Sequence, residues 1–371
     1  MPKSLGEKVK RKFLAPVTAI SVITALAVSA CGQAPEEGGG DKQASDFKSC
    51  IVSDAGGWDD RSFNESSKDG FDRAVNEFGL QKGEAESKDD SDYVQNVDNM
   101  VQQGCNLIYG VGFNLAGVLT DSAKQNKDVH YALIDSTFAE ADGTPVEVEN
   151  GKPLLFNTAE AAFLAGYLAA GTTETGKVAT FGGMQIPSVS IFMDGFADGV
   201  KKYNEDNGKD VKLLGWDKEA QKGSFSGDFD NQSQGQALTE QFLSQGADIV
   251  MPVAGPVGLG AAAAVAKDDK ARLIWVDADG YEAIPDYKDR VLTSVVKQIA
   301  NAVYDTTVES KDDKFSSEPY VGTLENEGVG LAPYHDFESK IDDELKSKVE
   351  NLKQDIIDGK IKVETPNAPT K

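Results

Sequence analysis

Short apolar segments alternate with helix-like stretches along most of the chain, and the apolar segments end in polar residues. The first, Ile51-Val52, is followed by a loop over 53–61 that contains two glycines and three aspartates. Apolar residues over 63–78 then recur with helical spacing, and Ser62 stands where a helix cap is expected. This order places the loop at the carboxyl edge of an α/β sheet, where open α/β sheets bind their ligands.

The same alternation continues and then restarts in the second half of the chain. Helical patterns separate the apolar segments, and strands that alternate with helices are typical of parallel βαβ units. The sequence therefore predicts two similar α/β lobes in tandem, followed by a charged helix over 345–357. The further strands are expected at 107–111, 130–134 and 154–157, and then at 177–181, 211–214, 248–253, 273–276 and 291–296.

Polar and aromatic side chains stand at the predicted strand ends. Singly, each has an ordinary structural explanation, because an aspartate after a strand commonly forms a turn. Phe192, four residues before Phe196, likewise has the spacing of a core residue. Together they offer aromatic surfaces, carboxylates and one cation, as a ligand cleft between two lobes requires. The candidates are Asp54, Phe63, Asn64, Asp135, Phe229, Gly255, Asp277 and Lys297.

Composition narrows the range of partners. The 371 residues suffice for two or three domains, and the 40% of hydrophobic residues allow a sizeable core. The formal net charge is -24, although five of the first twelve residues are lysine or arginine. So acidic a surface disfavours nucleic acid and anionic lipid as partners, and it favours neutral or cationic small ligands.

The amino terminus has the features of an export signal. A basic segment precedes an apolar run over 17–28, which is short for a membrane span. Its end resembles a bacterial lipobox, in which 1–30 is the signal peptide and Cys31 is diacylated. An ordinary cleaved signal with an incidental cysteine is the alternative. Residues 31–45 lack apolar periodicity and are expected to form a flexible tether, so the protein is predicted to be lipid-anchored on the extracytoplasmic face of the cell membrane.

The two remaining cysteines stand next to predicted strands. Cys50 opens the first strand, and Cys105 precedes the strand at 107–111. The first and third strands are neighbours in a doubly wound sheet, and disulfides are chemically allowed outside the cytoplasm. We therefore hypothesise a Cys50–Cys105 disulfide.

No catalytic or metal-binding motif is recognised. Neither His130 nor His335 has a plausible serine or cysteine partner nearby in sequence, so a His-based triad is disfavoured, and no cysteine or histidine spacing fits zinc. The segment 255–260 is not a G-x-G-x-x-G motif, and no Walker A lysine is present. The segment 54–65 has the length of an EF-hand loop but lacks its ligands and its central glycine. The sequence predicts neither enzymatic activity nor a metal or cofactor.

Several motifs resemble the basic membrane protein family, bacterial lipoproteins of the purine nucleoside receptor type that serve as substrate-binding parts of ABC importers. The resemblance begins at Val52-Ser53-Asp54 and Asp60-Arg61-Ser62-Phe63-Asn64 and covers nearly all of the mature chain. It continues at Gly110-Val111-Gly112-Phe113, Ile134-Asp135, Ala165-Gly166-Tyr167, Gly182-Gly183-Met184, Gly246-Ala247-Asp248, Val276-Asp277-Ala278-Asp279, Thr293-Ser294-Val295-Val296-Lys297 and Gly328-Val329-Gly330-Leu331.

The resemblance implies a type I periplasmic-binding-protein fold. In this α/β fold, two Rossmann-like lobes with parallel sheets are joined by a three-segment hinge and close on a ligand. The crossings are expected near Asn157, Ser294 and Gly330. The N-terminal lobe would comprise 46–157 and 294–330, and the C-terminal lobe 158–293 and 331–371.

The resemblance also implies a ligand, because family members mostly bind purine nucleosides and at least one branch binds a flavin. Phe63 and Phe229 would sandwich the base, with Asn64 and Asp135 at its edge. The ribose hydroxyls would be held by Asp277, Lys297 and Gly255, and Asp54 would support the site or contact the ligand. The long loop over 216–232 also contains Phe225, which is the alternative to Phe229. The nucleoside would be delivered to ABC permease subunits.

Two other classes of function are weighed against this one. A surface receptor or sensor of the same fold would present a ligand-dependent face to a signalling partner or host molecule. An enzyme, such as a nucleoside hydrolase, is disfavoured because catalytic residues are missing. Within the favoured class, riboflavin or another heteroaromatic molecule is the alternative ligand.

Overall fold

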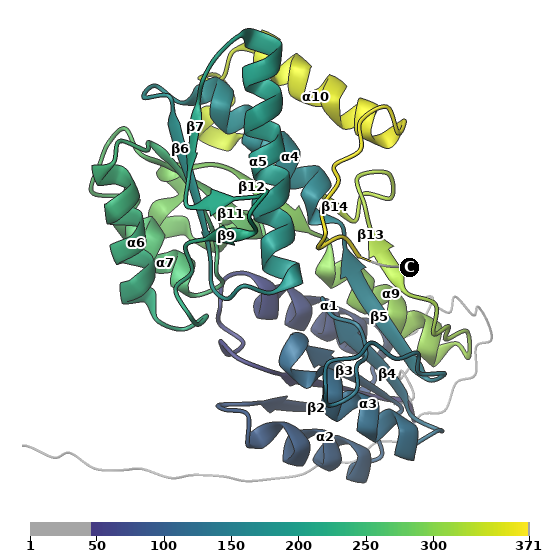
Figure 1. Ribbon diagram of the computed structural model, residues 1–371. Coiled ribbons are helices and arrows are strands. Elements are labelled where there is room, and N and C mark those ends of the chain that lie inside the picture. The colour runs from purple at the N-terminus through teal and green to yellow at the C-terminus, as the bar shows by residue number, and fades with distance from the viewer. Residues whose placement is uncertain (1–45, 370–371) are drawn as a thin grey trace, which may run out of the picture. The chain divides into compact units, whose positions relative to one another are not determined.

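The computed structural model describes residues 46–369, which form two α/β lobes (Figure 1). The N-terminal lobe is built on a six-stranded sheet of order β13-β5-β4-β3-β1-β2, in which every neighbouring pair is parallel. Its strands are β1 (Lys48–Ser53), β2 (Gln81–Glu86), β3 (Leu107–Val111), β4 (His130–Ile134), β5 (Gly151–Phe156) and β13 (Tyr320–Gly322).

Helices cover both faces of this sheet. The pair α1 (Phe63–Phe78) and α9 (Ile299–Lys311) packs together, as does the pair α2 (Asp92–Gln102) and α3 (Ala116–Gln125). Successive strand residues point to opposite faces. Ile51 of β1 therefore belongs to the apolar cluster that includes α1 and α9, whereas Cys50 belongs to the cluster with α2 and α3.

The C-terminal lobe repeats this plan. Its sheet has the order β14-β12-β11-β10-β6-β7, and only β14 runs antiparallel to its neighbour. The sequence pattern predicts that the alternation of strands and helices repeats in a second lobe, and this prediction is confirmed. The strands are β6 (Lys177–Gly182), β7 (Lys212–Leu214), β10 (Ile249–Val253), β11 (Arg272–Asp277), β12 (Val291–Lys297) and β14 (Val329–Leu331).

Helices also flank the second sheet. On one side α4 (Thr158–Thr172) packs against α5 (Pro187–Asn207), and α10 (Asp343–Ile357) packs against α4. The pair α6 (Gln232–Ser244) and α7 (Val257–Val265) contributes to the apolar cluster on the other side. The smaller elements are β8 (Trp216–Asp217), β9 (Lys222–Gly223), α8 (Gly280–Ala283) and the 3₁₀ helices η1 (Phe113–Leu115), η2 (Pro285–Arg290) and η3 (His335–Phe337).

The contact between α4 and α5 is unusually close because both helices present glycines to it. A Cβ atom on Gly166 would lie 2.1 Å from the carbonyl oxygen of Phe196, and one on Gly199 would lie 2.0 Å from that of Phe163. Only glycine permits such backbone proximity. Since α5 begins beside the cavity described below, this packing helps to fix where its first turn lies.

The chain passes between the lobes at three places. It leaves β5 for α4 at Asn157, leaves β12 for α9 after Lys297, and passes from β13 to β14. The boundary expected at Asn157 coincides with a crossing. The boundaries expected at Ser294 and Gly330 lie inside β12 and β14, because these strands pair over Val295 to Lys297 in the second sheet.

Five strands, namely β2, β8, β9, β13 and β14, have no counterpart among the strands predicted from the sequence, and β2 is the longest of them. The sequence pattern predicts no strand over 81–86, and most side chains of β2 are exposed. Its backbone nevertheless pairs with β1 in parallel over all six residues. An edge strand with this exposure carries little apolar signal, which is why the pattern misses it.

Cys50 and Cys105 form a disulfide, as hypothesised, with their Cα atoms 6.0 Å apart. The parallel pairing of β1 with β3 brings them together. The predicted signal peptide, Cys31 and the tether all lie outside the described residues. Among the helices of residues 46–369, none is both long and apolar enough to cross a membrane.

Candidate functional site

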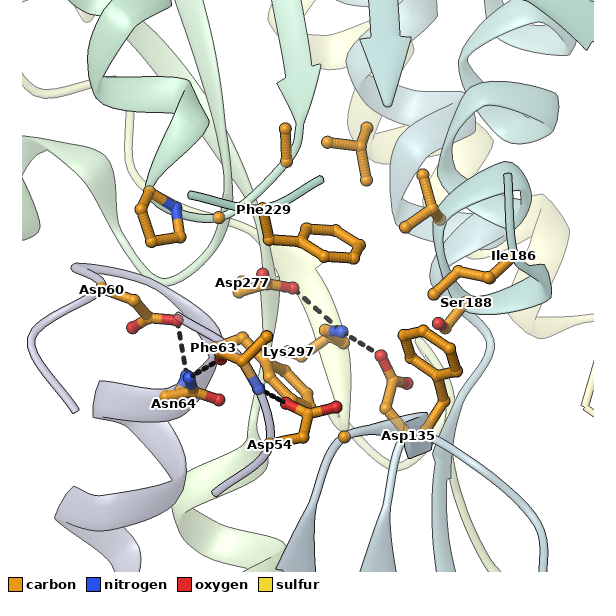
Figure 2. A pocket seen from close by; sticks show the side chains of 18 of the residues that line it. Asp54, Asp60, Phe63, Asn64, Asp135, Ile186, Ser188, Phe229, Asp277 and Lys297 are labelled. Carbon is orange, nitrogen blue, oxygen red and sulfur yellow. Dashed lines mark hydrogen bonds and ion pairs between the residues drawn. The ribbon is translucent and has the colours of Figure 1, made fainter. Parts of the chain in front are cut away.

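A cavity lies between the carboxyl ends of the two sheets (Figure 2). The space between its lining atoms, including the opening to solvent, is about 630 Å³. All eight predicted ligand-binding residues line it: Asp54, Phe63, Asn64, Asp135, Phe229, Gly255, Asp277 and Lys297. The other lining residues are Ala55, Asp60, Gly112, Phe113, Ile186, Ser188, Val189, Phe192, Val253, Ala254 and Pro256.

Lys297 joins carboxylates from both lobes in a group that we call the lysine cluster (Asp135, Asp277 and Lys297). Its Nζ lies 2.6 Å from Asp135 Oδ2 and 2.9 Å from Asp277 Oδ1, and its side chain is only 3% exposed. Asp135 directly follows β4 of the N-terminal lobe, whereas Asp277 ends β11 of the C-terminal lobe. Figure 2 shows the ammonium between the two carboxylates. The cluster therefore holds the two walls of the cavity together.

Burial and charge act against each other within the lysine cluster. Burial lowers the pKa of Lys297, but the adjacent Asp135 and Asp277 outweigh it and raise this pKa above its ordinary value, so the ammonium stays charged. Burial raises the pKa of Asp135, although Lys297 opposes the shift. The cluster has one carboxylate more than it has cations. It therefore favours a ligand that donates hydrogen bonds over one that carries negative charge.

Asp135 and Asp277 share an unusual backbone conformation. Their φ angles are 64° and 70°, in the left-handed region that few residues other than glycine adopt. Asparagine and aspartate tolerate this region best. Both residues directly follow a buried strand position, Ile134 or Val276, and the turn aims each carboxylate at Lys297. Such conformations at a strand end are typical of binding sites.

The first N–H groups of α1 are bound by Asp60 and not, as predicted, by the side chain of Ser62. The Asp60 carboxylate accepts hydrogen bonds from the backbone N–H groups of Ser62, Asn64 and Glu65 at 2.8–3.0 Å. Ser62 occupies the cap position, but its side chain makes no capping bond. The prediction that Ser62 caps the helix is wrong, because its hydroxyl donates across the cleft to Asp277 Oδ2 at 2.8 Å.

Asp60 and Asp54 are buried carboxyl groups whose pKa values are strongly shifted. Burial raises the pKa of Asp60 to about 6, against the lowering effect of its three N–H donors. Burial raises the pKa of Asp54 to about 7, although the N–H groups of Ala55 and Asn114 lower it. Asp54 is therefore partly protonated near neutral pH and can donate a hydrogen bond into the cavity.

A second polar group, which we call the amide cluster, consists of Asp54, Ala55 and Asn64. The Asn64 side-chain NH₂ donates to the carbonyl oxygens of Ala55 and Gly57 at 2.7 and 2.8 Å. The Ala55 N–H donates to Asp54 Oδ1 at 2.6 Å. Both Asn64 donor hydrogens are thus engaged, while its buried Oδ1 accepts no hydrogen bond from the described residues. A ligand N–H group would satisfy this acceptor.

Aromatic rings form much of the remaining wall. Phe63 comes from the start of α1 and Phe229 from the loop before α6. The Phe63 ring centroid is 4.8 Å from Lys297 Nζ, within cation–π range. Of the two alternatives in the long loop, Phe229 lines the cavity, whereas Phe225 packs edge-on against Trp216 at a centroid distance of 6.0 Å.

Phe192 is a core residue, as expected, but it also lines the cavity. It is 1% exposed and belongs to the main apolar cluster. Its ring centroid is 5.3 Å from Lys297 Nζ. The rule that finds Phe63, a helix start directly after a strand, would also have found Ser188 and Ile186 if applied to the second lobe.

The two lobes also contact each other beside the cavity. The indole Nε1 of Trp275 in β11 donates to the backbone oxygen of Arg61 at 3.1 Å. Arg61 has a φ of 59°, a left-handed conformation that is uncommon for arginine. Together with the Ser62–Asp277 bond, this contact ties the loop before α1 to the end of β11. The described conformation is therefore one in which the lobes are joined across the cleft.

Comparison with known proteins agrees with this geometry. Residues 47–366 match the family model for PnrA-like ABC transporter substrate-binding proteins, the Bmp family. The ABC transporter nucleoside-binding protein BmpA of Lactococcus lactis subsp. cremoris is 31% identical over 95% of this chain and 99% of its own length. Basic membrane protein A of Borreliella burgdorferi is 30% identical, over 82% of this chain and 84% of its own.

The solved structures include a close fold relative. An ABC transporter solute-binding protein from Aeropyrum pernix K1 superposes with a TM-score of 0.76 at 27% identity, covering 86% of this chain and 94% of the other. The family match and these relatives, together with the two α/β lobes around a cavity, identify an ABC transporter substrate-binding protein of periplasmic-binding-protein fold, not an enzyme. The chain belongs to the PnrA-like Bmp family, and the resemblance to basic membrane proteins is confirmed.

Proposed function

We propose that this substrate-binding protein is lipid-anchored through Cys31, binds purine nucleosides between its lobes and delivers them to ABC permease subunits. One observation carries the proposal. The buried Asp135–Lys297–Asp277 cluster lies beside the Phe63 ring in a cavity that Phe229 also lines. Carboxylates suit ribose hydroxyls, and aromatic rings suit a planar base.

The lysine cluster is the ribose site in this proposal. Asp277 and Lys297 bind the hydroxyls, with Gly255 beside them. Asp135 shares Lys297 with Asp277, so we assign Asp135 to this end of the ligand as well, although the family resemblance implies a role at the base edge. A deoxynucleoside would leave a buried acceptor without its donor, which disfavours its binding.

The amide cluster is the base site. Phe63 and Phe229 stack on the base, which contributes about 0.5–1.5 kcal/mol beyond burial for an aromatic pair. The unsatisfied Oδ1 of Asn64 accepts an N–H group from the base edge, and Asp54, with its pKa of about 7, either donates or accepts a hydrogen bond there.

The charges of the cavity also favour a nucleoside over a nucleotide. The cavity is lined by four aspartates and a single lysine, and both of the close carboxylate partners of this lysine are in place. A phosphate group would meet carboxylates without a free cation to balance it, and like charges at close range repel strongly at a buried site.

A thermal-shift screen of the chain without residues 1–31 tests the proposal. The ligands are purine nucleosides, 2′-deoxynucleosides, nucleobases, nucleoside monophosphates, riboflavin, sugars and amino acids. A ligand at about 100 times its Kd should add about 2.7 kcal/mol of stability. We expect a shift with nucleosides and a smaller one with deoxynucleosides and monophosphates. A shift with riboflavin alone would show that riboflavin, and not a purine nucleoside, is the ligand. If protein shown to be ligand-free responds to none of these compounds, the receptor function is favoured.

A further inference from the structure

The chain beyond α10 returns toward the cleft. Ile361 and Val363 pack on the main apolar cluster, and Lys218 Nζ donates to the backbone oxygen of Glu364 at 2.6 Å. Figure 1 shows this last part of the chain running from α10 toward β5 of the N-terminal lobe. We call the described residues 364–369 the tail segment.

The tail segment is anchored on a buried carboxylate. Asp194 of α5 is fully buried, and its Oδ2 accepts hydrogen bonds from Thr365 Oγ1 at 2.5 Å and from Asn367 Nδ2 at 2.9 Å. Its Oδ1 accepts from Trp216 Nε1 and Gln221 Nε2 at 2.9 and 2.8 Å. Charge-assisted bonds of this kind are among the stronger ones in proteins. Half of the donors to this charge therefore come from the tail segment.

The end of the tail segment lies at a second cavity next to the ligand cavity. Pro366 to Pro369 form one wall of it, and the other walls come from both lobes, including Ser136 and Thr137 of the N-terminal lobe and Ile191 of α5. The two cavities share four lining residues, namely Phe113, Asp135, Ile186 and Ser188. The tail segment thus covers the cleft on the side where Asp135 lies.

We propose that the tail segment is a strap that favours the closed cleft and slows exchange of the ligand. Its hydrogen bonds hold it to the C-terminal lobe, while Pro366 to Pro369 face the N-terminal lobe across the shared cavity. Separation of the lobes would move the N-terminal-lobe wall of this cavity away from Pro366 to Pro369 and expose more of the apolar lining to water, so the strap adds to the cost of opening. This proposal rests on the proposed function only in the measurement of ligand release, which uses a nucleoside.

Two variants test the strap without relying on one another. The double variant Thr365→Val with Asn367→Ala keeps the chain length but removes the two tail-segment donors to Asp194, and the second variant ends after Glu364. Stopped-flow measurement of inosine release should give rates about tenfold faster in both, since two bonds to a buried charge are lost. The control is Gln354→Ala, which removes an exposed bond to Asp358 away from the cleft and should leave release unchanged.

Hydrogen exchange provides a reading that needs no ligand. In the ligand-free double variant, the backbone N–H groups of 135–139 and 186–191 should exchange faster than in the unmodified chain. If inosine binds and both variants release it at the unmodified rate, the strap is overturned. If inosine does not bind the unmodified chain, the proposed function fails and exchange alone decides: faster exchange in both segments supports the strap, and unchanged exchange overturns it.

Discussion

The two lobes present the same framework to the cleft but different chemistry. Strand pairing aligns Val111 with Ile134 in one lobe, and Val253 and Val276 hold the matching positions in the other. Asp135 and Asp277 therefore occupy equivalent places after equivalent strands, with nearly equal φ angles. On the next strand the equivalence breaks, because β5 ends in Phe156 and β12 ends in Lys297.

This difference shows how one framework produces an asymmetric site. Two equivalent aspartates need a counter-charge when the lobes close, and a single lysine from one lobe serves both. The aromatic residue at the matching place packs near that lysine, with its ring centroid 5.9 Å from Nζ. A second lysine there would compete for the same two carboxylates and place like charges together.

The first strands of the lobes differ in the same way. Asp54 follows β1, and Gly183 follows β6 at the equivalent place. A Cβ atom at Gly183 would lie 2.4 Å from the ring of Phe229. The N-terminal lobe thus contributes a carboxyl group where the C-terminal lobe leaves room for an aromatic ring.

The largest effect is expected from Lys297→Met, which removes the charge on which the comparison depends. Asp135 and Asp277 would be left buried without a cation, and breaking a buried ion pair in this way costs about 3–5 kcal/mol of stability. We expect inosine affinity to fall more than about 100-fold as well, because the proposed ribose site loses its geometry. Urea denaturation and isothermal titration calorimetry measure the two effects.

Lys152→Met is the matched control. Lys152 in β5 is also buried, with a side chain 9% exposed. Its Nζ lies 2.5 Å from Glu309 Oε2, and this ion pair is not part of the cavity lining. This variant should lose stability but keep inosine affinity within about threefold. If the two lysine variants lost affinity equally, the effect of Lys297 would be one of general destabilisation.

The disulfide offers a second contrast, because of the two lobes only the N-terminal one contains cysteines. Replacing Cys50 and Cys105 by Ala removes a constraint across 55 residues of sequence, which should lower the free energy of unfolding by about 2–4 kcal/mol. Both cysteines pack with α2 and α3 on the face of the sheet opposite α1, and neither lines the cavity. Inosine affinity should therefore hardly change. Urea denaturation with parallel calorimetry measures this, and weak binding by a stable variant would contradict it.

Each lobe contributes one aromatic ring in the account above, so Phe63→Ala and Phe229→Ala should weaken inosine binding comparably. Loss of a stacking ring at a buried site should cost about 2 kcal/mol, or roughly 30-fold in Kd. Phe225→Ala should leave Kd within about threefold, because Phe225 packs against Trp216 outside the cavity. Calorimetric titrations of the three variants decide between Phe225 and Phe229, and a larger loss in the Phe225 variant would reverse the assignment.

The smallest effect concerns Asp54, the carboxyl group for which the C-terminal lobe has glycine. Its folded-state pKa of about 7 lies above the ordinary value of 3.8, so the folded state keeps a proton that the unfolded state releases. Stability from this group is present below about pH 4 and is lost as the pH rises through about 7. Raising the pH from about 5.5 to 7.5 should cost the unmodified chain about 1–2 kcal/mol more than Asp54→Asn. Equal pH dependence in urea denaturation would show that Asp54 is not shifted.

Much of the site follows from the sequence, because the carboxyl ends of parallel strands must meet at one edge. The eight candidate residues, from Asp54 to Lys297, therefore all line one cavity. Hydrogen-bond partners do not follow in the same way. Asp60 caps α1 while Ser62 bonds to Asp277 of the other lobe, and no local pattern records a partner more than 200 residues away.

The parts of the fold that the sequence pattern misses are held by backbone pairing. β2 is mostly exposed, and β12 extends to Lys297 because its last residues pair with β14. Apolar periodicity reports side-chain burial, so it cannot detect strands that backbone hydrogen bonds define. The anchoring of the tail segment on Asp194 is a further long-range contact, made by side chains, that apolar periodicity does not report.

A crystal structure of the chain without residues 1–31, grown with inosine, tests the central claim most directly. The account predicts the base between Phe63 and Phe229, an N–H group of the base at Asn64 Oδ1, and the ribose hydroxyls at Asp277 and Lys297. The lobes would then contribute unequally to base and sugar, as their strand ends indicate. A base stacked elsewhere, or a ribose that leaves Lys297 bound only to its two carboxylates, would contradict the account.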